Sequence, residues 1–166
     1  MISQPLYLLI LGGSAEASAL ARRLAGDDRF RVTFSLAGRT KSPAPQPVPV
    51  RTGGFGGVDG LVQFLAAEGI DILVDATHPF AAQMSRHAVE AARRGDTPLL
   101  SIRRPPWTPA SDDRWTVVEN MAAAAEALGA EPRTVCLTVG QKELAPFKAC
   151  PQHSYVVRSV DPPPAH

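Results

Sequence analysis

Short apolar runs that alternate with longer helical patterns constrain the fold of this 166-residue chain more than any other feature of its sequence. The first run, Leu6–Leu11, is uninterrupted and lies between Pro5 and Gly12, as expected for a strand that is buried on both faces of a sheet. Further strand patterns follow at residues 30–36, 48–51, 70–74, 99–102, 134–139 and 154–158. Amphipathic helical patterns are found at residues 14–25, 59–68, 79–94 and 119–128. This alternation predicts a doubly wound, Rossmann-like α/β fold with a mostly parallel sheet.

Proline-rich segments indicate where the chain divides, because proline removes a backbone donor and pushes the preceding residue out of the helical region. Residues 43–49 contain four prolines and residues 105–109 contain three. We expect a first Rossmann-like domain over residues 1–104, then a connecting segment with one helix over residues 105–132. The remainder, residues 133–166, is expected to begin a second α/β lobe.

The composition excludes several classes of function. The 17 basic and 16 acidic residues give a formal charge of +1, whereas a nucleic-acid-binding domain normally carries a basic excess. The apolar run near the start is far shorter than the roughly 20 residues that span a membrane, and it lacks the basic leader of a signal peptide. The two cysteines form no Cys-x-x-Cys pair, and no second ligand lies at metal-binding spacing from His78. We therefore expect a soluble, cytoplasmic protein that has no metal, no nucleic-acid partner and no membrane partner.

The turn after the first strand is suited to a phosphate group. Gly12 and Gly13 let the backbone approach a pyrophosphate, and Ser14 opens a helix whose N-terminus supplies free amide donors and a positive dipole. The glycine spacing departs from the usual three-glycine dinucleotide fingerprint. The alternative is a plain strand–helix turn in which Ser14 only caps the helix.

The turn after the second strand favours NADPH over NADH. An NAD site typically has an acidic residue here that holds the ribose 2′-hydroxyl, but nothing acidic lies between Arg29 and Arg51. Ser35, Arg39 and Lys41 offer a hydroxyl and cations instead, which suit a 2′-phosphate. The alternative is that both cations are ordinary solvated charges.

A glycine-rich loop follows the short strand at residues 48–51. It contains Gly54, Phe55 and Gly56 among four glycines, and each of these glycines has a large conformational entropy to lose on folding. A loop that closes over a flat ligand explains this composition, and a disordered surface hairpin is the alternative.

A further candidate loop joins the strand at residues 70–74 to the best-defined helix. Thr77 or His78 is expected to cap that helix, with Pro79 in its first turn. At this strand end, Thr77 and His78 lie where a cofactor is expected, and the His78 ring can donate to a phosphate, to the nicotinamide amide or to the substrate. The alternative is that His78 serves only as a cap or a hydrogen-bond partner.

The sequence indicates no nucleophilic catalysis. It has no Gly-x-Ser-x-Gly motif and no Tyr-x-x-x-Lys pair, so no catalytic residue is assigned firmly and His78 is the one candidate. Hydride chemistry belongs to a nicotinamide cofactor and needs positioning rather than a nucleophile. Arg104 and Lys142 are candidates for binding an anionic substrate.

Taken together, these loops resemble those of the precorrin-6A reductase family of cobalamin (vitamin B12) biosynthesis. The similarity rests on residues 12–17, 35–39, 51–57, 75–81, 104–107 and 138–140. It implies an oxidoreductase that uses NADPH to reduce one double bond of a macrocyclic tetrapyrrole, converting precorrin-6A to precorrin-6B by hydride transfer. It also implies two Rossmann-like lobes with the cofactor and substrate between them, of which residues 1–104 form the NADP-binding domain. The chain reaches only the beginning of the second lobe.

Three other functions fit the same cofactor loops. One is an NADPH-dependent reductase of another planar substrate, and another is a module that senses NADP(H) without turnover. The last is a domain that binds a nucleotide or sugar nucleotide through Arg39. Neither the proton donor, nor cobalt in the substrate, nor an oligomeric state follows from the residues.

Overall fold

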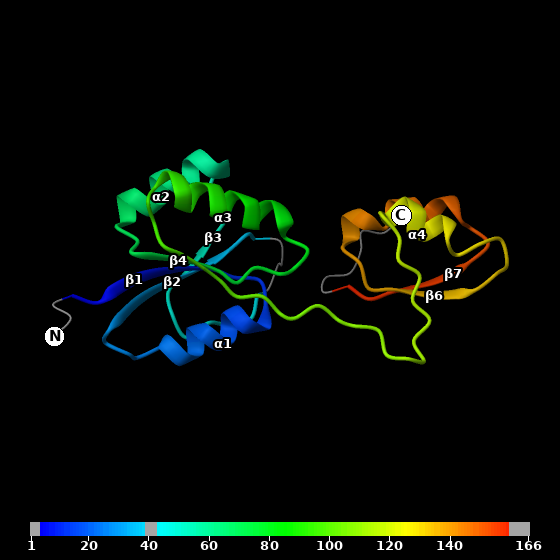
Figure 1. Ribbon diagram of the computed structural model, residues 1–166, viewed down its shortest axis with the longest axis horizontal. Helices are drawn as coiled ribbons and strands as arrows, with labels where there is room; N and C mark the ends of the chain where they lie inside the picture. Colours follow the sequence, from blue (N-terminus) through cyan, green and yellow to red (C-terminus); the bar gives the residue numbers. More distant parts are fainter. Residues whose placement is uncertain (1–3, 39–42, 160–166) are drawn as a thin grey trace. The chain divides into compact units, whose positions relative to one another are not determined.

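A five-stranded parallel sheet forms the centre of the first of two compact units, Met1–Pro106 and Trp107–His166 (Figure 1). The computed structural model describes residues 4–38 and 43–159. The strand order is β3 (Val50–Thr52), β2 (Phe30–Leu36), β1 (Leu6–Leu11), β4 (Ile72–Asp75) and β5 (Leu99–Ser101), and every neighbouring pair is parallel. This order reverses direction between β1 and β4, which confirms the predicted doubly wound, Rossmann-like fold.

Helices cover both faces of this sheet (Figure 1). They are α1 (Ala15–Leu24) on one face and α2 (Gly57–Glu68) and α3 (Ala82–Arg94) on the other. Successive residues of β1 point to opposite faces, so the strand contributes to both cores. Leu8 and Ile10 pack on the α1 side, and Leu9 and Leu11 pack on the side of α2 and α3. The uninterrupted apolar run therefore corresponds to a strand buried on both faces, as predicted.

The second unit contains a pair of parallel strands. They are β6 (Thr134–Leu137) and β7 (Ser154–Val157), preceded by the short helix α4 (Met121–Glu126). Two 3-10 helices, Gln141–Glu143 and Ala145–Ala149, provide the crossover that parallel pairing requires. Ala125, Leu137 and Phe147 form the core of this unit.

Several element boundaries differ from the predicted ones for local reasons. The strand expected from residue 70 begins at Ile72, because the amide of Ile70 donates to the carbonyl of Leu65 and completes the end of α2 (2.9 Å). Helix α4 is shorter than expected and begins after Asn120, whose side chain accepts from the amide of Ala123 (2.9 Å). Helix α3 begins at Ala82 rather than at residue 79, for a reason that lies in the loop before it.

Candidate functional site

The loops that follow the five strands meet at one edge of the sheet, because the strands are parallel. In folds of this kind, ligands bind beyond the carboxyl ends of the strands, at the point where the strand order reverses. That point lies here between β1 and β4. The loops that begin at Gly12 and at Ala76 flank it.

Gly12 and Gly13 are each required in the first loop for a different structural reason. A Cβ added to Gly12 would overlap the ring of Phe34, which is buried in β2. Gly13 has a φ of +125°, a conformation that residues with a side chain rarely adopt. A Cβ at Gly13 would lie 3.8 Å from the amide nitrogen of His78, so the backbones of the two flanking loops run close together.

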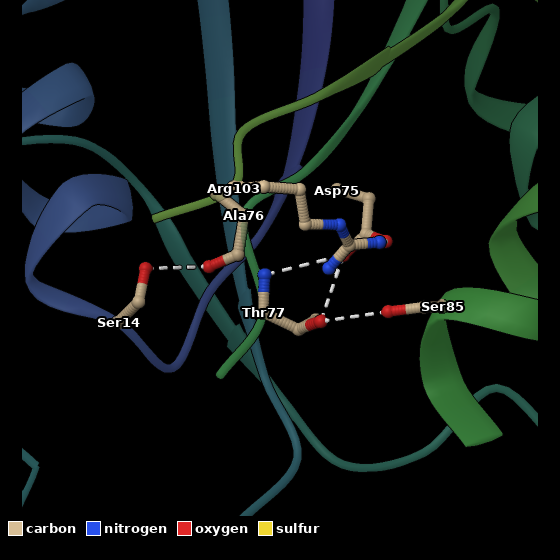
Figure 2. Close-up of polar contacts among 6 residues, drawn as sticks. All are labelled: Ser14, Asp75, Ala76, Thr77, Ser85 and Arg103. Atoms are coloured by element: carbon tan, nitrogen blue, oxygen red, sulfur yellow. Dashed lines mark hydrogen bonds and ion pairs between the residues drawn. The ribbon is translucent and has the colours of Figure 1, made fainter. Parts of the chain in front are cut away.

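Ser14 joins these two loops. Its side chain accepts a hydrogen bond from the amide of Ala17 (3.1 Å), which caps α1, and its hydroxyl donates to the carbonyl of Ala76 (2.7 Å; Figure 2). The hydroxyl proton is therefore used within the protein. What this turn offers a phosphate is backbone amides at the N-terminus of α1, where the Ala17 amide is already capped by Ser14.

Asp75, the last residue of β4, carries a fully buried carboxylate. Its Oδ1 accepts from the amide (3.2 Å) and from the hydroxyl (2.8 Å) of Thr77, and its Oδ2 accepts from Nη2 of Arg103 (2.6 Å; Figure 2). Burial by itself raises the pKa of Asp75. Hydrogen bonds from Thr77 and Ser85, together with the Arg103 charge, outweigh burial and hold this pKa below its ordinary value.

Both the amide and the hydroxyl of Thr77 are bonded to this carboxylate. Its hydroxyl has one proton and gives it to Asp75, so the contact with the hydroxyl of Ser85 (3.2 Å) is one in which Ser85 donates. Thr77 is also almost completely buried. The predicted cofactor contact at this position therefore has only backbone atoms available to it.

The expectation that Thr77 or His78 caps α3, with Pro79 in its first turn, is wrong. The carbonyl of His78 accepts from the amide of Ala81 (2.8 Å), and Nδ1 of His78 accepts from the amide of Phe80 (3.2 Å), so residues 78–81 form a tight turn. The residue before α3 is Ala81, which provides no side-chain cap. With Nδ1 accepting, the neutral His78 ring carries its proton on Nε2, and the side chain is exposed.

An ion pair lies at the N-terminus of α1. Arg104 donates to Oε1 of Glu16 through Nε (2.9 Å) and Nη2 (2.8 Å). The backbone amide of Glu16, and then the Arg104 guanidinium, hold the pKa of the Glu16 carboxyl below its ordinary value. Arg104, predicted to bind an anionic substrate, thus neutralises a carboxylate of the protein itself.

Arg51 organises the glycine-rich loop. Its Nη1 donates to Oγ of Ser35 (2.8 Å) and to the carbonyl of Gly53 (3.0 Å), and its Nη2 donates to the carbonyl of Gly54 (3.3 Å). Its guanidinium lies 3.9 Å from the ring centre of Phe55, a geometry typical of cation–π contact. The loop is thereby tied to the end of β2, beside the place where a 2′-phosphate is expected.

The described residues contain neither a metal-ligand cluster nor a membrane-spanning helix. Among residues 4–38 and 43–159, no group of three or more histidine, cysteine, aspartate or glutamate side chains is arranged to hold a metal ion. Within the same ranges, no helix has the length and apolar character needed to cross a lipid bilayer.

Comparison with known proteins identifies the family of this chain. The sequence pattern of one family, Precorrin-6x reductase CbiJ/CobK, matches residues 7–166. The chain belongs to this family. The precorrin-6A reductase of Sinorhizobium sp. is 55% identical over 155 residues, which are 93% of this chain and 59% of that protein. The precorrin-6A reductase of Rhodobacter capsulatus is 53% identical over 94% of this chain and 62% of its own length.

A solved structure is also similar to this chain. It is described as CobK precorrin-6A reductase, shares 51% identity and superimposes with a TM-score of 0.91 over 97% of this chain and 64% of its own. The chain thus spans about three fifths of the length of the curated relatives named above. The expected resemblance to precorrin-6A reductases is confirmed.

Some predicted site residues do not lie with the residues around Asp75 or with those around Arg51. Arg39 and Lys41, the predicted 2′-phosphate contacts, lie outside the described residues. Lys142 is exposed in a 3-10 helix of the second unit. The other predicted residues lie on the edge where the loops meet, with Ser14 and Thr77 near the strand reversal and Ser35, Gly54 and Phe55 near Arg51.

Sequence reasoning missed three residues that hold this edge together, namely Asp75, Arg103 and Arg51. Asp75 had a usable signal, because an aspartate directly after a buried strand needs a partner when it is covered. Nothing local indicated that Arg103, 28 positions further along, is that partner.

Proposed function

We propose that the protein is an NADPH-dependent reductase that converts precorrin-6A to precorrin-6B. The observation that carries this proposal is the match of residues 7–166 to a reductase family. The reaction adds a hydride and a proton across one carbon–carbon double bond of the macrocycle, which is a two-electron reduction. NADPH supplies the hydride when bound and leaves as NADP⁺.

The residues of the sheet edge fit this cofactor. The left-handed turn at Gly13, beside the first turn of α1, leaves backbone amides for a pyrophosphate. The paired charges of Glu16 and Arg104 remove the repulsion that a lone carboxylate in that turn would exert on a phosphate. We assign Gly12, Gly13 and Ser14 to the pyrophosphate through their backbone.

The end of β2 supplies the preference for a 2′-phosphate. Ser35 and the Arg51 guanidinium lie there in contact, and no carboxylate follows in residues 37–50 to hold a free 2′-hydroxyl. We assign Ser35, Arg39 and Lys41 to the 2′-phosphate, with Gly54, Phe55 and Gly56 packing beside the adenosine. Residues 1–104 are then the NADP-binding domain, and residues 133–166 begin the second lobe.

His78 is the candidate for a contact with the reacting groups. Its backbone passes Gly13 at the strand reversal, and the protonated Nε2 of its exposed ring is a donor. We propose that this donor orients the nicotinamide amide or the macrocycle, with water as the source of the proton.

The proposed reaction is tested by isotope transfer. The protein is incubated anaerobically with precorrin-6A and with NADPH deuterated at its transferable hydrogen, and the product is analysed by mass spectrometry. The proposal predicts a reduced tetrapyrrole that contains one deuterium, together with NADP⁺. NADPH binding without deuterium transfer to any tetrapyrrole would instead indicate a non-catalytic NADP(H)-binding module.

A further inference from the structure

The guanidinium of Arg103 is held by a buried carboxylate. Arg103 follows β5, and the amide of the preceding Ile102 donates to the carbonyl of Asp75 (2.9 Å), which extends the sheet ladder by one residue. The Arg103 side chain then reaches Asp75, which has no exposed surface (Figure 2). The ion pair thus joins the end of β4 to the segment that follows the adjacent strand β5.

The carboxylate of Asp75 is itself fixed. Thr77 binds Oδ1 through two donors, the Ser85 hydroxyl contacts the Thr77 hydroxyl, and Oδ2 accepts from Arg103. A buried carboxylate without a partner is costly, and this cost keeps the Arg103 guanidinium in place. The ion pair with Asp75 therefore fixes the Arg103 guanidinium more firmly than an exposed arginine without such a partner is fixed.

Arg103 differs from Arg51 and Arg104 in how many of its guanidinium nitrogens donate hydrogen bonds within the protein. Arg104 uses Nε and Nη2 on Glu16, and both Nη atoms of Arg51 are bonded to Ser35 and to loop carbonyls. Among the interactions found in residues 4–38 and 43–159, Arg103 uses Nη2 only, and 46% of its side chain is exposed. Its Nε, its Nη1 and the second hydrogen of Nη2 remain available, so one edge of the guanidinium still presents two parallel donors.

We propose that Arg103 binds an oxyanion of the substrate, a side-chain carboxylate of the tetrapyrrole, and that Asp75 is its positioning residue. A guanidinium offers a planar pair of donors that matches a carboxylate. Because it is pre-positioned, little side-chain entropy is lost on binding. This inference rests on the proposed function for the identity of the ligand. A cofactor phosphate has the same oxyanion chemistry, so the test separates the two sources.

Binding measurements that do not need turnover test this inference. The probes are uroporphyrin, a stable tetrapyrrole with free carboxylates, and NADPH, each titrated into wild-type protein and into the variant Arg103→Lys. Lysine keeps the charge but loses the planar fork. We expect uroporphyrin affinity to fall about tenfold, which corresponds to roughly 1.4 kcal/mol, and NADPH affinity to change by less than about twofold. The matched control is Arg29→Lys, because Arg29 is largely exposed and pairs with Asp27 in the turn before β2, at the opposite sheet edge.

The outcomes are distinct. Loss of NADPH affinity with uroporphyrin binding unchanged would assign Arg103 to the cofactor and overturn the inference. Unchanged binding of both probes, or no uroporphyrin binding by the wild type, would also overturn it. None of these results depends on hydride transfer, so failure of the inference is distinguishable from failure of the proposed reaction.

The positioning role of Asp75 is tested by a double-mutant cycle. Asp75→Asn keeps an acceptor for Thr77 but removes the charge that orients Arg103. If Asp75 acts through Arg103, its substitution weakens uroporphyrin binding in the wild type and has little further effect in Arg103→Lys. Additive losses would contradict this role. Circular dichroism establishes which variants fold, and the single variant Arg103→Lys tests the oxyanion site independently.

Discussion

Replacing Arg103 by methionine is expected to destabilise the first unit in a pH-dependent way. Methionine keeps a long apolar stem but leaves Oδ2 of the fully buried Asp75 without its charged partner. Breaking a fully buried ion pair in this way costs about 3–5 kcal/mol. Because 46% of the Arg103 side chain is exposed, solvent screens the pair, and we expect a loss of roughly 1–3 kcal/mol at pH 7.

The pH dependence follows from the direction of the Asp75 shift. In the wild type the folded-state pKa of Asp75 lies below its ordinary value, so its stabilisation is present above the unfolded pKa and is lost as the pH falls through the folded pKa. In Arg103→Met the folded-state pKa rises, because burial is less strongly opposed. The difference in unfolding free energy is therefore largest at neutral pH, and it shrinks as the pH falls through the raised folded-state pKa of the variant towards the lower one of the wild type.

Far-UV circular dichroism during urea unfolding measures this difference, with amide hydrogen exchange in β1 and β4 as a local readout. Tryptophan fluorescence does not report on this unit, because Trp107 and Trp115 both belong to the second. A loss of 1 kcal/mol corresponds to a decrease in Tm of about 4–8 °C for a unit of this size. An equal loss at neutral and at acidic pH, or no loss at all, would refute the reasoning.

Four further substitutions test other parts of the first unit. Arg39→Ala is expected to weaken NADPH binding about tenfold and NADH binding little, and equal losses in a titration would contradict the 2′-phosphate assignment. Gly60→Ala is expected to lower the unfolding free energy by roughly 1–3 kcal/mol, because the added Cβ overlaps the carbonyl of Phe55. Gly54→Ala meets nothing within 4 Å and is expected to reduce turnover while Tm is kept; a large fall in Tm would refute this. His78→Ala is expected to lower kcat about tenfold or more with NADPH affinity retained, and an unchanged kcat would remove His78 from the site.

The parts of the fold that could be predicted are those in which one local pattern dominates. The strand Phe30–Leu36 was predicted at both ends, because its apolar residues alternate between clear turn signals. The start of α3 was not predicted correctly, because Pro79 is equally suited to a helix N-terminus and to the turn that the backbone forms. What decided between them was Asp75, which ties Thr77 to the strand end.

The candidate site was predictable to the level of loops rather than of side chains. Glycines after a buried strand predicted where a phosphate could approach, because that requirement falls on the backbone. The partners of Asp75, Glu16 and Ser35 could not be predicted. Each partner is an arginine: Arg103 and Arg104 follow β5, and Arg51 lies in β3. Such contacts depend on how far a long side chain reaches in space.

The central claim is that the first unit binds NADPH through the loops at the carboxyl edge of its sheet. The most direct test is a titration of the protein with NADPH and with NADH, followed by the fluorescence of the nicotinamide itself. The account predicts saturable binding of NADPH that is at least about tenfold tighter than that of NADH. Equal affinities, or no binding of either nucleotide, would contradict it.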